Sequence, residues 1–387
     1  MKNKLIFYVL IAIQSIAFNF AHPVTPTLIK SLNLDNSTFG IAYSSMALSS
    51  FLFSQFWSYV CNKKDDRYVS LIGSIFYGLA QFLFVNSTSL SQIVFARFLG
   101  GGFVAAINIS NLVYIIRNTD EKSRGQALMT FTTVVSVSSA LGYLVGGYIG
   151  NSNIFIAFYS QIVIMIICSI LYVLLLKKND IPPNEASIKD INPFIGFKLE
   201  KSINIILTLL LIITFVSTTA STIYDQSFNY YLKDIFNFTP SSNGTIKAIS
   251  ALLILIVNST ITLYLMRNNK SLIGLMFTFV ACSIALTRMI ITKNLSEFLM
   301  FNYAIAAINS VHVPIIQQLV TTQGEQNKNI VGTYNALKSL GWIVGGIVAG
   351  ISYKSHHHLP FLIATIAFVA CGIIVLLIMK SKKQSVY

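Results

Sequence analysis

Apolar residues fall in twelve long runs, and each run is long enough to be a membrane-spanning helix. A helix needs about 20 predominantly apolar residues to cross a bilayer core, and the runs occupy most of the 387-residue chain. The pattern therefore predicts an all-α polytopic membrane protein with twelve transmembrane helices. The predicted spans are residues 5–21, 39–61, 68–85, 90–116, 127–149, 154–176, 203–228, 246–266, 272–291, 298–320, 331–353 and 359–379.

The longest polar interval lies between the sixth and seventh runs. Residues 177–202 contain Pro182, Pro183 and five lysines. Such a stretch is typical of a linker. We predict an N-terminal six-helix bundle at residues 1–176, a cytoplasmic linker, and a C-terminal six-helix bundle at residues 203–387.

Two glycine-rich blocks indicate that the halves are pseudo-symmetric repeats. SSALGYLVGGYIG, residues 138–150, returns as SLGWIVGGIVAG, residues 339–350, with its glycines at an offset of 199 residues. The tetrapeptide AAIN at 105–108 returns at 306–309, at an offset of 201. Small residues on one helix face let another membrane helix approach to backbone contact. We expect the glycines to form a conformational seam: Gly142, Gly146, Gly147, Gly341, Gly345 and Gly346.

Basic residues lie on one side of the predicted topology. Nineteen of the 27 Lys and Arg fall before the first span, in the even-numbered loops or after the last span, whereas Lys30, Lys233, Lys293 and Lys354 fall on the other side. Short cytoplasmic loops carry such an excess of Lys and Arg, so both termini are predicted to be cytoplasmic. We expect a multi-pass monomer in the cell membrane of a bacterium, with the lipid bilayer as its surroundings.

Composition and motifs exclude several classes of function. The net charge is +14, but it comes from helix ends and forms no continuous basic face, so no nucleic-acid partner is expected. No GxxxxGKS, HExxH, GxSxG or CxxC pattern occurs, and the chain is not expected to be an enzyme. The four cysteines lack ligand spacing and the histidine run 356–358 has no accompanying carboxylate, so neither a metal site nor a cofactor is expected.

Several motifs carry a family resemblance. Two six-helix halves joined by a basic linker resemble the major facilitator superfamily, and Arg97, Gly101 and Ala105 are similar to its fourth-helix pattern of an arginine followed by small residues. Gly142, Gly146 and Gly147 are similar to the GPxxGG motif of the drug:proton antiporter branch, with a tyrosine in place of the proline. The loop after the second span resembles the family's acidic and basic loop motif at Ser58, Asn62, Lys63, Asp65, Asp66 and Arg67.

The resemblance implies secondary active transport by alternating access. The first, fourth, seventh and tenth helices would line the path, and each of these spans carries polar residues at helical spacing. Interhelical hydrogen bonding is an alternative explanation for such polar residues. The candidate substrate-binding residues are Tyr8, Ser15, Asn19, Asn108, Asn111, Thr218, Thr222, Asn302, Asn309 and His312, with His22 on the first-helix stripe.

Charged residues within spans are candidates for proton coupling. Charged side chains are costly at a bilayer centre and rarely face lipid. Asp225 is the only acidic residue placed within a predicted span, and a buried carboxylate can titrate near neutrality. His312 and Arg97 are the other candidates. An ion pair between Asp225 and either Arg288 or Lys247 is the alternative.

These observations favour proton-coupled efflux of small amphipathic organic compounds, with protons as the co-transported partner. Uptake or export of one metabolite, such as a sugar, an amino acid or a lipid precursor, is the alternative, because the first six spans contain no acidic residue. A receptor or membrane enzyme would require a catalytic cluster or a soluble domain, and the sequence contains neither pattern.

Overall fold

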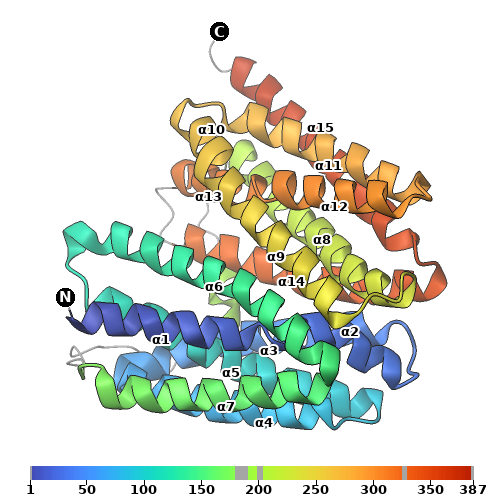
Figure 1. Cartoon of the computed structure of the whole chain (residues 1–387). Coiled ribbons are helices and arrows are strands. Elements are labelled where there is room, and N and C mark those ends of the chain that lie inside the picture. Colours follow the sequence, from blue (N-terminus) through green and yellow to red (C-terminus); the bar gives the residue numbers. More distant parts are fainter. Residues whose placement is uncertain (1, 179–190, 198–203, 325–328, 385–387) are drawn as a thin grey trace. The chain divides into compact units, whose positions relative to one another are not determined.

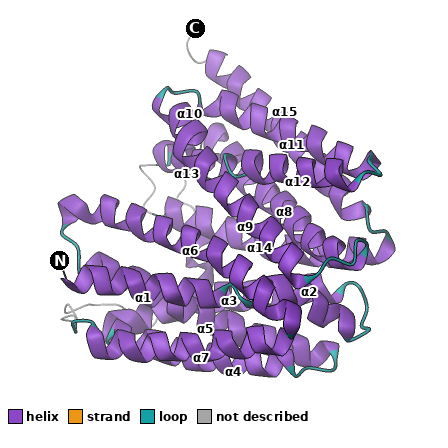
Figure 2. Ribbon diagram, viewed as in Figure 1, coloured by secondary structure: helices purple, strands orange, loops and turns teal. Residues whose placement is uncertain are grey.

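A computed structural model describes residues 2–178, 191–197, 204–324 and 329–384, which form helices joined by short loops, without a strand (Figures 1 and 2). The predicted linker lies mainly on residues outside this description, and the division at 177–202 stays a prediction. The α-helices are α1 (Lys2–Phe18), α2 (Ala21–Ser31), α3 (Thr38–Lys63), α4 (Asp66–Val85), α5 (Leu90–Arg117), α6 (Arg124–Ser152), α7 (Ile154–Leu175), α8 (Ile205–Asp234), α9 (Pro240–Val257), α10 (Leu263–Arg267), α11 (Ser271–Ile291), α12 (Leu295–Asn309), α13 (His312–Gln323), α14 (Ile330–Ser355) and α15 (Leu359–Gln384).

Every predicted span corresponds to a helix or an interrupted helix, which confirms the all-α membrane fold. Among the described residues, eleven helices are long and apolar enough to cross a membrane. The remaining long helix, α3, has 26 residues. A helix of that length spans about 39 Å. Its six serines, from Ser44 to Ser58, lower its hydropathy, and α3 is not among the eleven apolar helices. With α3, the described long helices match the twelve predicted spans.

Three predicted spans are interrupted. The first breaks at Asn19 and Phe20, and α2 then continues through Pro23 in its first turn and Pro26 inside the helix. The prediction ended this span at Ala21, but a proline in a first helical turn removes no intrahelical hydrogen bond. The tenth breaks between Asn309 and His312. The eighth contains a π-helical turn, Asn258–Thr262, between α9 and α10. Discontinuous helices are frequent at transport sites.

The chain forms two compact units. Unit 1 comprises Met1–Leu34, Ser45–Pro193 and Leu232–Ala251, and unit 2 comprises Asp35–Ser44, Phe194–Tyr231 and Leu252–Tyr387. The second and eighth spans, α3 and α9, correspond in the two repeats, and each contributes its first residues to one unit and the remainder to the other.

The core of unit 1 is aromatic at one end and hydrogen-bonded in its middle. Phe7 of α1 stacks on Tyr114 of α5 with ring centroids 5.1 Å apart, and Tyr172 of α7 lies edge-on to both. Trp57 of α3 is buried, and its indole Nε1 donates to the Gly102 carbonyl of α5 at 2.7 Å. The aromatic contacts pack α1, α5 and α7 together, and the indole hydrogen bond ties α3 to α5.

In unit 2, α11 packs against α12 and α15. Phe279 of α11 stacks on Phe368 of α15 at 6.0 Å, and both are fully buried. Large apolar side chains on the opposite faces are exposed, among them Phe277 at 67% and Ile366 at 61%. An apolar surface of this kind marks a face that contacts lipid in a membrane protein. The four cysteines are free and buried.

Candidate functional site

Unit 1 contains a cavity of about 440 Å³ bounded by α1, α2, α5, α6 and α7. Its wall combines amides, hydroxyls and aromatic rings, a mixture typical of small-molecule sites. The lining residues are Ile11, Gln14, Ser15, Phe18, Asn19, His22, Ile107, Asn108, Asn111, Leu112, Phe131, Val135, Ser139, Tyr143 and Met165. None of them is a carboxylate, a lysine or an arginine.

A buried chain of hydrogen bonds fixes the amides at the back of this cavity. Asn111 Nδ2 donates to Gln14 Oε1 at 3.1 Å. Gln14 Nε2 in turn donates to the hydroxyls of Ser169 and Ser74, at 3.3 and 3.4 Å. With its donor engaged, Asn111 retains a buried carbonyl oxygen, Oδ1, that has no hydrogen-bond partner among the described residues. An orphaned buried acceptor costs free energy unless a ligand or water satisfies it.

A second amide, Asn19, ties the break in the first span to α6. Its Nδ2 donates to the Ser15 carbonyl at 2.8 Å and to the Ser139 hydroxyl at 3.0 Å. The ring of His22, just beyond the break, lies 5.6 Å from the ring of Tyr143 of α6. The interrupted helix therefore presents its polar groups to the cavity and to α6.

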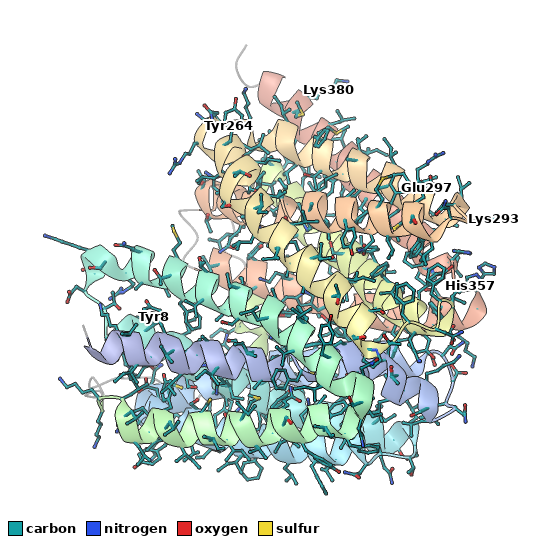
Figure 3. All side chains as sticks on the ribbon, in the orientation of Figure 1. Tyr8, Tyr264, Lys293, Glu297, His357 and Lys380 are labelled. Carbon is teal, nitrogen blue, oxygen red and sulfur yellow. The ribbon has the colours of Figure 1, made fainter. Side chains whose placement is uncertain are left out.

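The structure brings together four of the ten predicted substrate-binding residues in this cavity: Ser15, Asn19, Asn108 and Asn111. Tyr8, on the same predicted stripe, does not line it: its hydroxyl donates to the Ala127 carbonyl of α6 at 3.2 Å (Figure 3). Sequence reasoning missed Gln14 and the whole contribution of α6. A strict four-residue spacing was the available signal, and it runs through Phe131, Val135, Ser139 and Tyr143.

The second-half candidates lie in unit 2, around the break in the tenth span. Ser221 donates to Asn309 Oδ1 at 3.1 Å, and Tyr224 donates to Asn302 Oδ1 at 2.6 Å. The His312 ring contacts the Asn309 carbonyl through Nδ1, while Nε2 is buried without a partner among the described residues. Helices α8 and α12 are thus joined by side-chain hydrogen bonds. This is the alternative role given above for polar residues in these spans, in place of lining the transport path.

Thr218 and Thr222 of α8 belong to a different contact. Their hydroxyl groups turn toward their own helix, and Thr222 Oγ1 donates to the Thr218 carbonyl at 2.8 Å. Their Cβ atoms face glycines of α14: a Cβ built on Gly341 or Gly345 would lie 2.8 or 2.6 Å from them. These threonines pack against glycine in the described structure.

The three proton-coupling candidates have dissimilar surroundings. The guanidinium of Arg97 lies over the Phe84 ring, 3.5 Å from its centroid, and its Nη2 approaches the Thr25 hydroxyl at 3.4 Å. Asp225, whose proton role was expected to depend on burial, is exposed on α8 and accepts a hydrogen bond from Gln226 Nε2 at 3.5 Å. His312 is buried at the break described above. The three candidates do not lie in one unit. Arg97 belongs to unit 1, whereas Asp225 and His312 belong to unit 2.

Arg288 is one of the two alternative ion-pair partners that the sequence offers for Asp225. In the structure it pairs with Glu297, with Nη2 and Oε1 3.4 Å apart; Glu297 is at the start of α12 (Figure 3). Both side chains are substantially exposed. An exposed pair of this kind contributes little to stability.

The glycine blocks contact two different helices each. In unit 1, Cβ atoms built on Gly142 and Gly146 would lie 2.4 Å from the Ile16 carbonyl oxygen and from Phe20 Cα, both of the first span. A Cβ on Gly147 would instead lie 2.6 Å from the Pro240 carbonyl oxygen of α9. Gly142 and Gly146 of this block therefore pack against a helix of their own sequence half, whereas Gly147 packs against a helix of the other half.

Unit 2 repeats this arrangement. Gly341 and Gly345 face α8, as described, whereas a Cβ on Gly346 would lie 2.3 Å from the Ser44 hydroxyl and 3.1 Å from the Gly40 carbonyl oxygen of α3. The glycine on the partner helix corresponds too, since Gly244 of α9 faces Gly147 and Gly40 of α3 faces Gly346 and Gly350. The paired glycines allow backbone contact at both crossings.

Charged side chains hold the loop after the second span in place. Asp65 caps α4 by accepting from the Arg67 backbone N–H, and its Oδ2 pairs with Arg67 Nη2 at 2.7 Å. Arg67 Nη1 also donates to the Leu176 carbonyl at 2.7 Å, just past the end of α7. Burial acts to raise the pKa of Asp65, but the hydrogen bonds and charge of Arg67 outweigh it and hold that pKa below its ordinary value.

The chain is similar to a known family of proteins. The family model described as Major Facilitator Superfamily matches residues 7–346. Multidrug resistance protein 2 of Bacillus subtilis (strain 168) is 24% identical over 99% of this chain and 97% of its own length. Quinolone resistance protein NorA of Staphylococcus aureus (strain COL) is 20% identical, with 98% of each chain covered.

Solved structures are similar in fold. A single-site variant of the nucleoside transporter NupG has a TM-score of 0.79 at 14% identity, with 97% of this chain and 99% of NupG covered. A bacterial homolog of the human lysosomal transporter Spinster has a TM-score of 0.75 at 10% identity, covering 97% and 96%.

Proposed function

The chain belongs to the Major Facilitator Superfamily, and from this premise we propose that it exports small amphipathic organic compounds in exchange for protons. The observation that carries the proposal is the cavity of unit 1, whose amides and aromatic rings suit compounds with both polar and apolar parts. The full-length relatives named for multidrug and quinolone resistance support the same substrate range.

Alternating access is the proposed mechanism, and the glycine crossings are the proposed seam. The contacts of α6 with α9 and of α14 with α3 each join helices from different halves of the sequence at backbone distance. Packed helices without long side chains between them can separate and rejoin with little rotamer reorganisation. We infer that these two crossings open and close during the cycle, while the glycines facing α1 and α8 stay packed within their own half.

Asp225 is the proposed proton carrier, with His312 and Arg97 as further participants in coupling. Its carboxylate lies in α8, in the same unit as the buried His312. We infer that the transport path opens alternately to the two sides of the cell membrane, with both termini cytoplasmic and the chain acting as a monomer. The basic residues at the predicted cytoplasmic helix ends support this orientation.

Transport into proteoliposomes under an imposed pH gradient tests the proposal. A panel of aromatic amphiphiles and polar metabolites is offered to wild-type protein and to Asp225→Asn. We expect uphill movement of amphiphiles that collapses when the gradient is removed, and a loss of pH dependence in the variant. Gradient-independent transport, or an unchanged pH profile in Asp225→Asn, would contradict proton coupling through this residue.

Transport of one polar metabolite is the second candidate. The fold likeness to NupG, a nucleoside transporter, and the amide-rich wall of the cavity favour it. In the same assay it predicts saturable uptake or export of a single metabolite that amphiphiles do not inhibit.

A further inference from the structure

We propose that the cavity of unit 1 selects uncharged, hydrogen-bonding aromatic compounds and rejects organic cations. This inference rests on the proposed export function and specifies its substrate class. The first observation is the composition of the wall: the fifteen residues that bound the cavity include three asparagines and one glutamine, but no acid.

Charge in the surrounding helices points the same way. Among the described residues of unit 1, the acids lie in loops or at helix ends, at Asp65, Asp66, Asp120, Glu121 and Asp234. The charged residues away from helix ends are basic, Arg97 in α5 and Lys247 in α9. A cation that leaves water for such a cavity loses hydration without gaining a counter-charge from the described residues of unit 1, and this cost is large in a medium of low dielectric constant.

The orphaned acceptor defines what the cavity takes instead. Asn111 lines the cavity, and its Oδ1 has no partner in the described structure. Neighbouring atoms cover this oxygen, so a ligand donor reaches it by displacing them, and the bond from Asn111 Nδ2 to Gln14 fixes the orientation of the amide. An amide carbonyl accepts well from the N–H or O–H of a neutral ligand. Phe18 and Phe131, on α1 and α6, supply aromatic surface in the same wall. The matching ligand has an aromatic body and a neutral donor group.

Export of such a ligand has a definite charge balance. A neutral molecule leaves as each proton enters, so each proton taken up moves one positive charge inward. The exchange is therefore driven by the membrane potential as well as by the pH gradient. Exchange of a monovalent cation for one proton would move no net charge and would not respond to the potential.

Two probes that share one aromatic body test the selectivity. Equilibrium binding of labelled biphenyl-4-carboxamide, which is neutral, is compared with that of (biphenyl-4-ylmethyl)trimethylammonium, a permanent cation, on the purified full chain. We expect wild-type protein to bind the amide at least about tenfold more tightly, because the cation lacks both a counter-charge and a donor. Equal or tighter binding of the cation, or no binding of the amide, overturns the inference.

Variants separate the two contributions. Asn111→Leu removes the acceptor and should weaken amide binding by about five- to tenfold, the usual effect of one hydrogen bond. Asn108→Asp places a carboxylate on the exposed part of the wall and should improve cation binding by about tenfold or more. Asn86→Asp, at the exposed end of α4, makes the same chemical change away from the cavity and should alter neither affinity. Unchanged binding in both cavity variants overturns the inference.

Failure of the selectivity is distinguishable from failure of export. Proton-driven efflux of cations by wild-type proteoliposomes, with tighter cation binding, would sustain the export proposal and refute the selectivity. Potential-driven export of the amide supports both.

Discussion

The crossing of α6 with α9 in unit 1 and that of α14 with α3 in unit 2 use corresponding segments of the two repeats. In both, a glycine of the partner helix touches a backbone carbonyl: a Cβ on Gly244 would lie 2.3 Å from the Tyr143 oxygen, and one on Gly40 would lie 2.2 Å from the Gly346 oxygen. The ion pairs beside them differ. Lys30 pairs with Asp234, whose side chain is 10% exposed, whereas Lys354 and Asp35 are 62% and 39% exposed.

Both crossings therefore share a glycine-to-backbone contact, whereas their ion pairs differ in how deeply they are buried. A close glycine contact depends on the absence of a side chain and tolerates no substituent. An ion pair depends on its burial, because solvent screens exposed charges. Mutations should therefore have equal effects on transport at the two partner glycines, Gly244 and Gly40, and unequal effects on stability at the two ion pairs.

The largest effect is expected at the partner glycines. Gly244→Leu and Gly40→Leu each place a side chain where a backbone carbonyl now lies, so each should abolish transport while the chain still inserts into the membrane. Proteoliposome flux, normalised to reconstituted protein, measures this. Gly125→Leu is the matched control, because a Cβ at that position meets nothing within 4 Å. Transport by either crossing variant at the control's rate would remove that crossing from the cycle.

The next effect separates neighbouring glycines. Gly146 packs on Phe20 of its own half, so Gly146→Leu should lower the free energy of unfolding by about 1–3 kcal/mol, the usual cost of overpacking. Gly147→Leu touches α9 instead and should impair flux more than it impairs stability. Thermal unfolding and flux of the same preparations measure the two effects, and Gly345→Leu and Gly346→Leu should repeat the pattern in unit 2. Equal losses of flux and of stability in the variants of two neighbouring glycines would contradict their separate roles.

The glycine blocks show which features of the helix packing the sequence predicts and which it does not. Their spacing predicted close helix packing, and repetition predicted it twice. The identity of the neighbours was not predictable, because adjacent residues on a helix point about 100° apart. Gly146 and Gly147 therefore meet different helices, and the segment that meets Gly147 begins at Pro240, before the predicted start of the eighth span.

The cavity gives a similar lesson. Asn108 and Asn111 were predictable from their spacing on one face of a strongly apolar helix. Gln14 and Tyr143 were not selected, because their role depends on which faces of α1 and α6 meet α5, and this is set by tertiary packing. Arg97, a proton-coupling candidate on the same helix as Asn108, packs on Phe84 rather than in the cavity wall.

A smaller effect is expected at the ion pairs. A double-mutant cycle with Lys30→Ala and Asp234→Ala should give a coupling free energy near 1 kcal/mol, because the carboxylate is largely buried, and one with Lys354→Ala and Asp35→Ala should give about 0.2–0.5 kcal/mol. Thermal unfolding at two salt concentrations provides the measurement. Equal couplings would show that burial does not distinguish the pairs.

The smallest effect concerns pH. Hydrogen bonds from Lys354 and from Ser37 lower the pKa of Asp35 from 3.8 to about 2. A lowered carboxylate pKa contributes stability above its unfolded value, and that stability is lost only as the pH falls through the folded value. Between pH 5 and 8 this pair stays charged. Asp35→Asn should therefore leave the pH profile of transport unchanged, and a shifted profile would implicate Asp35 in coupling.

The chain contains two tryptophans, and they lie in different units. Trp57 is buried against Gly102 in unit 1, whereas Trp342 of α14 is 38% exposed in unit 2, with the Lys338 ammonium 5.3 Å from its ring. Each unit thus has its own intrinsic fluorophore, one in a dry environment and one beside a cation. Replacing either by phenylalanine leaves a single emitter, so ligand-induced spectral changes can be assigned to one unit without an attached dye.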